Sequence, residues 1–336
     1  MSDTTKIQWA THTGGPYLGC YPVSPGCVNC YAWALAESRL ELIFRRAYQA
    51  AGFKDWKTRP VWGREATRVL SKGFWKDAVS VNRHHAKAGT RGRWFPSMID
   101  WLEDMPGGII DQDGKKLDPV AVLADFLKLI HDTPNLDWLL LTKRPENWYG
   151  RLFQAENEVN DGAVTDWLET WLADGVAPHN VWLGVSVEDQ PRADERIPEL
   201  LKIPAAVRFL SLEPLLGPVD LSRWTTPPRA IDREFLKSFW GILGGESGPG
   251  ARPCNVEWIR DLLRQCQAAG VPCFVKQVGT RPYYGDPERG AQEGSRFGKW
   301  IELRHPKGGD LTEWPEDLRI RQFPRPSTLI DPRPSP

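Results

Sequence analysis

Three of the six cysteines lie in one short stretch of the chain, at Cys20, Cys27 and Cys30. Their spacing is C-x6-C-x2-C, and the prolines and glycine between them keep the stretch out of regular structure, so we expect a loop. Three thiols on a short, stiff loop can converge on a metal ion or a cluster. A disulfide fits this loop poorly, because the number of thiols is odd and pairing across C-x2-C is strained.

Two kinds of centre remain open for this loop, and the alternative is three thiols with no ligand role. Structural zinc takes four ligands, and His12 is the one nearby histidine that could complete the set. An iron–sulfur cluster held by three cysteines leaves one iron open for a small chelating molecule, which accounts for the missing fourth ligand. Among the other cysteines, we expect Cys266, on an apolar helix face, and Cys273, in a strand, to be structural.

Short apolar runs alternate with amphipathic helical patterns along most of the chain. The expected strands are Arg93–Ser97, Trp138–Thr142, Val181–Val187, Val207–Leu212, Trp240–Gly244 and Cys273–Lys276, with Ile7–Trp9 as a candidate first strand. The expected helices are Tyr31–Tyr48, Pro119–His131, Val164–Leu172, Asp194–Leu201 and Val256–Ala269. Such alternation predicts an α/β fold of parallel βαβ units. Six or seven strands suit a complete or partial TIM-like (β/α) barrel.

The sequence predicts one barrel domain over residues 1–278 and a proline-rich extension over 279–336, whose end, Arg325–Pro336, is expected to be disordered. Inside the barrel domain, residues 52–93 show weak periodicity and are expected to form an irregular insertion rich in Trp and Arg. Basic and aromatic residues alternate there, which could bind a nucleic-acid strand by charge and stacking. The alternative is a surface layer whose tryptophans cover the core.

The charge balance excludes a global electrostatic attraction to nucleic acid or membrane, because 43 basic residues face 43 acidic ones. The first residues lack the charged start and apolar run of a signal peptide. No apolar run approaches the roughly 20 residues that span a bilayer. We therefore expect a cytoplasmic protein with no membrane partner, whose cysteines are thiols or ligands rather than disulfides.

Polar residues follow the expected strands at the points where they end. In a barrel these ends meet on one face, where the chemistry takes place. The residues at these ends include Asp100, Lys143, Arg144, Ser186, Glu188, Glu213, Gly244, Gly245, Glu246 and Lys276. Three carboxylates around one barrel mouth are costly without cations, and the basic residues of this set could balance them. Taken singly, each acid could equally be a helix cap or an exposed loop residue.

These motifs make the chain similar to a phage-associated protein family of unknown function that is considered radical-SAM-like. The resemblance runs from about residue 6 to residue 278. It rests on S-P-G-C-V-N-C-Y-A (residues 24–32), L-T-K-R-P (141–145), W-L-G-V-S-V-E (182–188), R-F-L-S-L-E-P-L (208–215) and G-G-E-S-G-P-G-A-R-P (244–253).

The resemblance implies a [4Fe–4S] cluster bound by Cys20, Cys27 and Cys30, with S-adenosylmethionine chelating the fourth iron. Reduction by an external electron donor would then cleave S-adenosylmethionine to methionine and a 5′-deoxyadenosyl radical, which abstracts a substrate hydrogen. The usual spacing of radical SAM enzymes is C-x3-C-x2-C, so the first gap of this loop is longer than usual.

The resemblance also suggests roles for the strand-end residues. Glu188, Glu213 or Glu246 would accept hydrogen bonds from the ammonium group or ribose of S-adenosylmethionine. Lys143 or Arg144 would pair with its carboxylate or with a substrate phosphate, a task that suits the planar guanidinium of arginine.

Gly244 and Gly245 would let the backbone approach the cofactor closely, and Asp100 and Ser186 are further candidates. The expected function is a radical SAM-type enzyme acting on nucleic acid or a nucleotide. The alternative is a non-catalytic iron–sulfur or zinc protein that binds nucleic acid. A metal-dependent hydrolase fits less well, because neither His131 nor His179 lies at a strand end.

Overall fold

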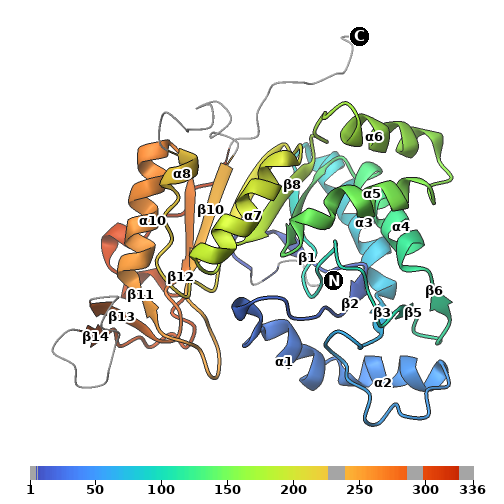
Figure 1. The fold of residues 1–336 in the computed structure, drawn as a ribbon, viewed down its shortest axis with the longest axis horizontal. Coiled ribbons are helices and arrows are strands. Elements are labelled where there is room, and N and C mark those ends of the chain that lie inside the picture. The colour runs from blue at the N-terminus through green and yellow to red at the C-terminus, as the bar shows by residue number, and fades with distance from the viewer. Residues whose placement is uncertain (1–4, 6, 226–238, 286–297, 325–336) are drawn as a thin grey trace. The chain divides into compact units, whose positions relative to one another are not determined.

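The structure of the chain is a computed structural model (Figure 1). It describes residues 5, 7–225, 239–285 and 298–324. The chain divides into two compact units. Unit 1 consists of Met1–Leu183 and Glu199–Ala205, and unit 2 consists of Gly184–Pro198 and Ala206–Pro336. In the described ranges, no helix combines the length and the apolar character needed to cross a membrane.

The main sheet has the strand order β1-β4-β7-β8-β9-β10-β12. Its strands are β1 (His12–Thr13), β4 (Gly92–Phe95), β7 (Leu136–Thr142), β8 (Val181–Ser186), β9 (Val207–Leu212), β10 (Phe239–Gly244) and β12 (Cys273–Gln277). In unit 1, β4 pairs in parallel with β1 and β7, and in unit 2, β10 pairs in parallel with β9 and β12. The α/β class is therefore confirmed. In this strand order β1 and β12 do not pair with each other, so the described strands do not close a complete barrel.

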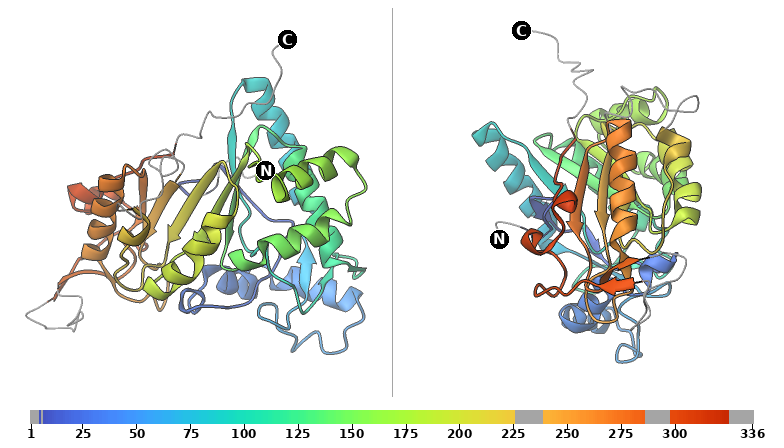
Figure 2. Two further views of the ribbon diagram at one scale, coloured as in Figure 1. Left: turned by 45° about the horizontal axis from the view of Figure 1, so that its top comes forward. Right: turned by 90° about the vertical axis from the view of Figure 1, so that its left-hand side faces the viewer.

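Helices lie between and beside these strands. They are α1 (Tyr31–Ser38), α2 (Glu41–Ala50), α3 (Lys72–Ala88), α4 (Pro119–His131), α5 (Trp148–Glu156), α6 (Gly162–Leu172), α7 (Gln190–Lys202), α8 (Ser222–Thr225) and α10 (Val256–Ala269), with 3-10 turns η1 (Pro25–Cys27), η2 (Pro145–Asn147), η3 (Leu311–Glu313) and η4 (Glu316–Leu318). In unit 1, α3 contacts β4 and β7, and in unit 2, α10 contacts β10 and β12 (Figure 2).

Two small sheets complete the described fold. One has the order β2-β3-β5-β6 and lies in unit 1, and the other has the order β11-β13-β14 and lies in unit 2. Their strands are β2 (Tyr17–Leu18), β3 (Arg68–Leu70), β5 (Ile109–Ile110), β6 (Lys116–Leu117), β11 (Cys254–Asn255), β13 (Pro282–Gly285) and β14 (Gly298–Trp300).

The best-predicted helices carry their own start and stop signals. The bounds of α4 and α10 agree with the sequence prediction, because an apolar stripe lies between caps. Asp118 accepts a hydrogen bond from Val120 N at the start of α4, and Asn255 accepts one from Glu257 N at the start of α10. Gly270 ends α10 in the left-handed conformation at φ 72°.

The insertion predicted to be irregular, residues 52–93, contains β3, the seventeen-residue helix α3 and the first residues of β4. The prediction is wrong for its second half. Only Phe74 and Ala78 of α3 are buried, so the apolar stripe is too narrow to give a clear helical period. The helix ends at Gly89, which is left-handed at φ 63°.

Two further predictions are corrected near the N-terminus. The helix expected over Tyr31–Tyr48 is broken into α1 and α2 at Arg39 and Leu40, with Leu40 packed against the core between them. The candidate strand Ile7–Trp9 is a turn, closed by a hydrogen bond from Ala10 N to Ile7 O, and the first strand is β1.

Part of the C-terminal extension packs on unit 2. Residues 320–323, which we call the strap, run antiparallel along the free edge of β12, where Arg321 pairs with Phe274. Val275 N donates to Ile320 O at 2.8 Å, and Gln322 N donates to Cys273 O at 2.7 Å. The strap covers the backbone edge that β12 would otherwise expose. The predicted disordered end, Arg325–Pro336, lies outside the described residues.

Candidate functional site

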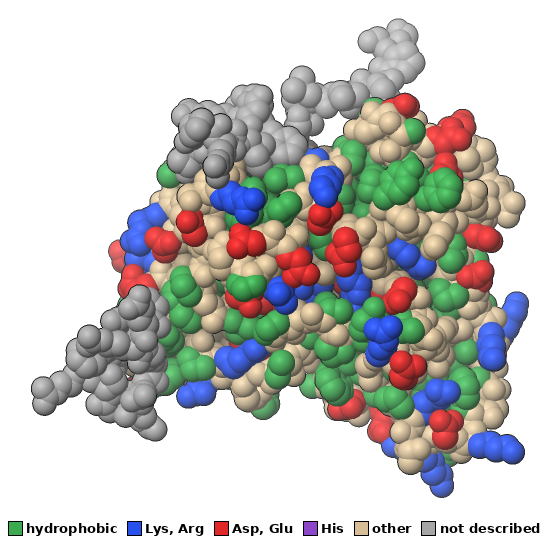
Figure 3. Space-filling model, viewed as in Figure 1, with side chains coloured by type: hydrophobic (Ala, Val, Ile, Leu, Met, Phe, Trp, Pro, Cys, Tyr) green, Lys and Arg blue, Asp and Glu red, His purple; other side chains and the backbone are tan. Residues whose placement is uncertain are grey.

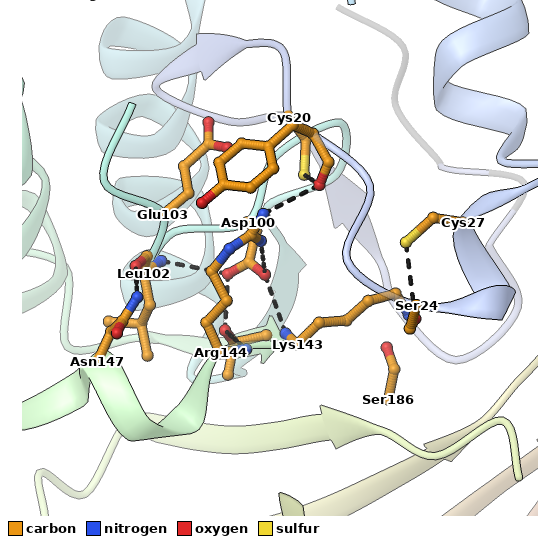
Figure 4. Close-up of polar contacts among 12 residues, drawn as sticks. Cys20, Ser24, Cys27, Asp100, Leu102, Glu103, Lys143, Arg144, Asn147 and Ser186 are labelled. Atoms are coloured by element: carbon orange, nitrogen blue, oxygen red, sulfur yellow. Dashed lines mark hydrogen bonds and ion pairs between the residues drawn. The ribbon is translucent and has the colours of Figure 1, made fainter. Parts of the chain in front are cut away.

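The cysteine loop of unit 1 is anchored beside the ends of β4 and β7 (Figure 4). Gly19 N donates to Met98 O at 3.2 Å, just beyond β4. Beyond the end of β7, Arg144 Nη2 donates to Tyr21 O at 2.9 Å. The loop therefore lies at the carboxyl ends of these parallel strands, where ligands of α/β folds bind.

Asp100 connects the residues that anchor the loop. Its carboxylate accepts hydrogen bonds from Thr142 Oγ1 and Arg144 Nη1, both at 2.6 Å, and from Lys143 N at 2.9 Å. The Asp100 and Arg144 side chains are 6% and 4% exposed, and the Arg144 guanidinium lies 4.1 Å from the centre of the Tyr21 ring. Burial opposes the charge of Arg144, but the Asp100 carboxylate outweighs it and raises the pKa of the guanidinium.

A second buried ion pair lies beneath the loop. Arg68 donates from Nε and Nη2 to the two carboxylate oxygens of Glu103, at 2.7 and 3.1 Å, and both side chains are fully buried. Burial raises the pKa of Glu103, and Arg68 opposes that shift. A Cβ on Gly19 would lie 2.5 Å from Arg68 Cδ, so the loop passes over this pair at a distance that requires glycine.

The three thiols have different surroundings. Burial raises the pKa of Cys20 well above its usual value, and the Glu103 and Asp100 carboxylates add to the shift. Burial also raises the pKa of Cys30, where the backbone N–H groups of Ala32 and Trp33 oppose it. Cys30 precedes α1 directly, so its sulfur lies at the positive end of that helix.

Cys27 and Cys30 are neighbours, and Cys20 has other charged groups around it. The charge of Cys27 acts on the pKa of Cys30, and the Cys27 sulfur lies 3.7 Å from Ser24 Oγ. Figure 4 shows Cys20 beside the Asp100–Arg144 pair instead. Within the described part of the chain, no group of three or more His, Cys, Asp or Glu side chains is arranged to hold a metal ion. As they are placed, the three thiols do not form one set of metal ligands.

In unit 2, the carboxyl ends of β8, β9, β10 and β12 are joined by backbone hydrogen bonds. Val187 N donates to Ser211 O at 2.8 Å, Leu215 N to Gly244 O at 2.9 Å, and Gly245 N to Gln277 O at 3.1 Å. The strand-end residues Glu188, Glu213, Glu246 and Lys276 therefore come together at one edge of this unit.

Each of the three glutamates has a basic partner. Glu188 is fully buried and accepts a hydrogen bond at 3.0 Å from Arg196 Nη1, which also donates to Ser186 O at 2.9 Å. Glu246 accepts hydrogen bonds from Arg252 Nε at 2.9 Å and Nη2 at 2.6 Å. Such pairing offsets the cost of gathering carboxylates.

The third glutamate, Glu213, is paired by charge. Its Oε1 lies 3.1 Å from Lys276 Nζ, at an angle outside hydrogen-bond geometry, so Oε1 is buried without a hydrogen bond.

Gly244 and Gly245, which were predicted to let the backbone approach a cofactor, instead lie close to other atoms of the protein. A Cβ on Gly244 would lie 2.7 Å from Glu213 Oε1, and one on Gly245 would lie 2.5 Å from Val278 O.

One family model matches the chain over residues 4–299, and its description is protein of unknown function (DUF5131). The chain belongs to this family. Comparison with curated proteins finds no match. Comparison with solved structures finds none either.

Sequence reasoning missed four charged residues of this DUF5131 protein. Glu103 and Arg68 follow no strand-end motif, and both are fully buried. Arg196 lies eight positions after Glu188, which places it on the helix that follows β8. Arg252 is the second-last residue of the G-G-E-S-G-P-G-A-R-P motif, so its pairing with the glutamate of the same motif could have been anticipated.

Proposed function

We propose that this DUF5131 protein is an iron–sulfur enzyme of the radical SAM type that acts on nucleic acid or a nucleotide. The observation that supports it is the pair Cys27 and Cys30 at the N-terminus of α1, where Cys30 directly precedes the helix and its N–H donates to Cys27 O at 3.3 Å. Burial raises the pKa of Cys30, and the backbone N–H groups of Ala32 and Trp33 and the charge of Lys143 oppose that rise. Hydrogen bonds to sulfur and nearby positive charge stabilise thiolate ligands of a cluster.

Cys20 would be the third ligand, and it would have to turn away from Asp100 and Arg144 to reach the other two. A bound [4Fe–4S] cluster with S-adenosylmethionine would supply radical chemistry at this end of unit 1. The proposal includes the finer fold assignment, a partial TIM-like barrel.

The strand-end residues of unit 2 are proposed to bind S-adenosylmethionine or substrate. Among them, Glu213 is the leading candidate, because its carboxylate is held by charge alone and one of its oxygens has no hydrogen bond. Glu188 and Glu246 are fixed by Arg196 and Arg252. These two glutamates would bind a ligand only by giving up part of those contacts.

Anaerobic reconstitution with iron and sulfide tests the proposal. We expect about four irons and four sulfides per chain, an EPR signal that S-adenosylmethionine perturbs, and 5′-deoxyadenosine after reduction. Cys30→Ala should abolish all three, and Cys266→Ala, a buried thiol of unit 2, should leave them intact.

Iron that binds equally well to the Cys30→Ala variant would overturn the proposal. One bound zinc without iron would instead support the alternative, a non-catalytic zinc protein.

A further inference from the structure

A basic surface lies directly beside the cysteine loop in unit 1. Residues 39–65, which hold α2 and the turn after it, contain seven basic and three acidic residues, although the whole chain is balanced. Each of the three acids forms an ion pair with an arginine, in the pairs Glu41–Arg45, Asp55–Arg59 and Glu65–Arg64. The remaining four cations, Arg39, Arg46, Lys54 and Lys57, are exposed and have no carboxylate partner in the described part of the chain.

One aromatic ring, that of Trp56, lies beside basic side chains of this surface. Trp56 is half-buried, with the Lys57 ammonium and the Arg45 guanidinium 5.6 and 5.9 Å from its ring centre. Tyr31, the residue after Cys30, is 56% exposed. In Figure 3, Lys and Arg side chains protrude at the lower right of the molecule, over the position of α2 in Figure 1.

This surface is built on the same core as the cysteine loop. Gly63 N donates to Cys20 O at 3.1 Å. Cys20, Cys30 and Trp56 all pack against one cluster of buried residues, which includes Phe44 and Trp62. A ligand held on residues 39–65 is therefore held beside the cysteines by rigid packing.

From these contacts we infer that residues 39–65 and Tyr31 form a binding surface for a single strand of nucleic acid. Exposed cations match the phosphates, and aromatic faces between them match the bases, which is the usual combination in proteins that bind single strands. A membrane would require an apolar helix face, and among the large hydrophobic side chains of α2 only Leu42 is more than a third exposed. The part of the inference that makes this strand the substrate rests on the proposed function.

The helix α3 provides the contrast, because it is also basic and its C-terminal end lies away from the cysteine loop. Lys76, Arg83 and Lys87 are exposed on it. Its C-terminal turn adjoins the start of β4, where a Cβ on Gly92 would lie 2.6 Å from the His85 ring. The cysteine loop lies at the other end of β4. If charge alone decided binding, nucleic acid would bind both surfaces equally, so α3 is the matched control.

Fluorescence anisotropy with labelled 20-nucleotide single-stranded DNA and RNA, duplex DNA and anionic vesicles tests the inference. We expect single strands to bind more tightly than duplex or vesicles. The triple variant Arg46→Gln/Lys54→Gln/Lys57→Gln should weaken binding at least tenfold near 100 mM salt. It should also reduce the slope of log affinity against log salt by about 2, at roughly 0.7 per lost contact.

The matched variant Lys76→Gln/Arg83→Gln/Lys87→Gln removes the same charge from α3 and should change affinity by less than about threefold. A further variant, Trp56→Leu, keeps an apolar side chain and should still cost about tenfold through lost stacking. Circular dichroism checks that each variant is folded.

Equal losses in the two triple variants, or preference for duplex or vesicles, would overturn the inference. Binding does not require iron, so failure here is distinguishable from failure of the iron–sulfur proposal.

Discussion

At the scale of single residues, the charged side chains under the cysteine loop hold it in place. Asp100 accepts hydrogen bonds from Thr142, Lys143 and Arg144 at the end of β7. Arg144 in turn holds Tyr21, because its guanidinium donates to Tyr21 O and lies over the Tyr21 ring. The sequence suggested Arg144 as a partner of cofactor carboxylate or substrate phosphate. In the structure its guanidinium contacts the protein, so it positions the loop and would meet a ligand only by releasing these contacts.

Replacing Arg144 tests this restraint. Arg144→Ala leaves the Asp100 carboxylate buried without its counter-ion, and breaking a buried pair typically costs about 3–5 kcal/mol of unfolding free energy. Arg144→Lys keeps the charge but cannot reach Asp100 and Tyr21 together, so we expect an intermediate loss. Urea unfolding measures both. Arg264→Ala, which removes an exposed pair with Asp261, should cost less than about 1 kcal/mol. Equal losses in the buried and the exposed variants would contradict the assigned role.

Tyr48 links the basic surface to the core and predicts a pH dependence. Its hydroxyl lies 3.1 Å from Pro60 O and 3.0 Å from Thr67 O, and burial raises its pKa to about 12, with Arg59 and Arg68 opposing. The folded state thus holds the proton more tightly than the unfolded state. This contribution to stability is complete below about pH 10 and is lost as the pH rises towards 12.

The variant Tyr48→Phe should cost about 1 kcal/mol at pH 8 through the lost hydrogen bonds. It should match or exceed the wild type above pH 11, because phenylalanine does not ionise. Urea unfolding at pH 8, 10 and 11 measures the crossing. Tyr149→Phe, whose ring is 59% exposed, controls for the loss of a surface phenol. A constant difference at every pH would contradict the assigned shift.

At the scale of elements, the helices with local signals are also the ones with defined ends. Asn255 caps α10 by accepting from Glu257 N at 3.0 Å, and its Nδ2 donates to Gly285 O at 2.9 Å. Its side chain therefore joins α10 to β13. Asn255→Ala should lower the unfolding free energy by about 1–2 kcal/mol. Asn255→Ser keeps a capping oxygen and loses the bond to Gly285, so thermal unfolding should place it between the alanine variant and the wild type.

The elements that the sequence predicts well are those whose apolar pattern and caps lie within their own residues. The bounds of α4, α10 and β9 agree with prediction, because their apolar pattern and caps lie within the element. The sequence does not predict α3, because its narrow buried face gives only a weak helical period of apolar residues.

The candidate site follows the same rule. The strand ends were located correctly, since they follow the strands. The partners Arg196 and Glu103 were missed, because long side chains reach across elements and tertiary packing alone decides what they contact.

At the scale of the whole molecule, stability depends on a contact between the end of the described chain and the middle of unit 2. Besides its backbone bonds to β12, the strap accepts a hydrogen bond from Trp240 Nε1 at Gln322 O, at 2.9 Å. Phe323 lies 5.3 Å from the Trp240 ring and 5.4 Å from the Phe274 ring. The strap therefore contributes both edge protection and aromatic packing.

Truncation separates these contributions from the rest of the chain. A chain that ends at Arg319 keeps the buried Trp314 and Leu318 but loses the strap. We expect it to lose about 2–4 kcal/mol of unfolding free energy through the missing hydrogen bonds and to aggregate through the free edge of β12. A chain that ends at Pro324 keeps every strap contact and is the control. Thermal unfolding with light scattering compares them, and identical behaviour of the two chains would show that the strap is dispensable.

The position of the strap also sets an order for folding during synthesis. Protein chains leave the ribosome from the N-terminus, and domains begin to fold as they emerge. All seven strands of the main sheet are translated before residues 320–323, so β12 emerges with an unprotected edge and stays so until the strap follows. During that interval the nascent chain is most exposed to pairing with other chains. Chaperone dependence and misfolding of this protein should therefore be greatest late in translation.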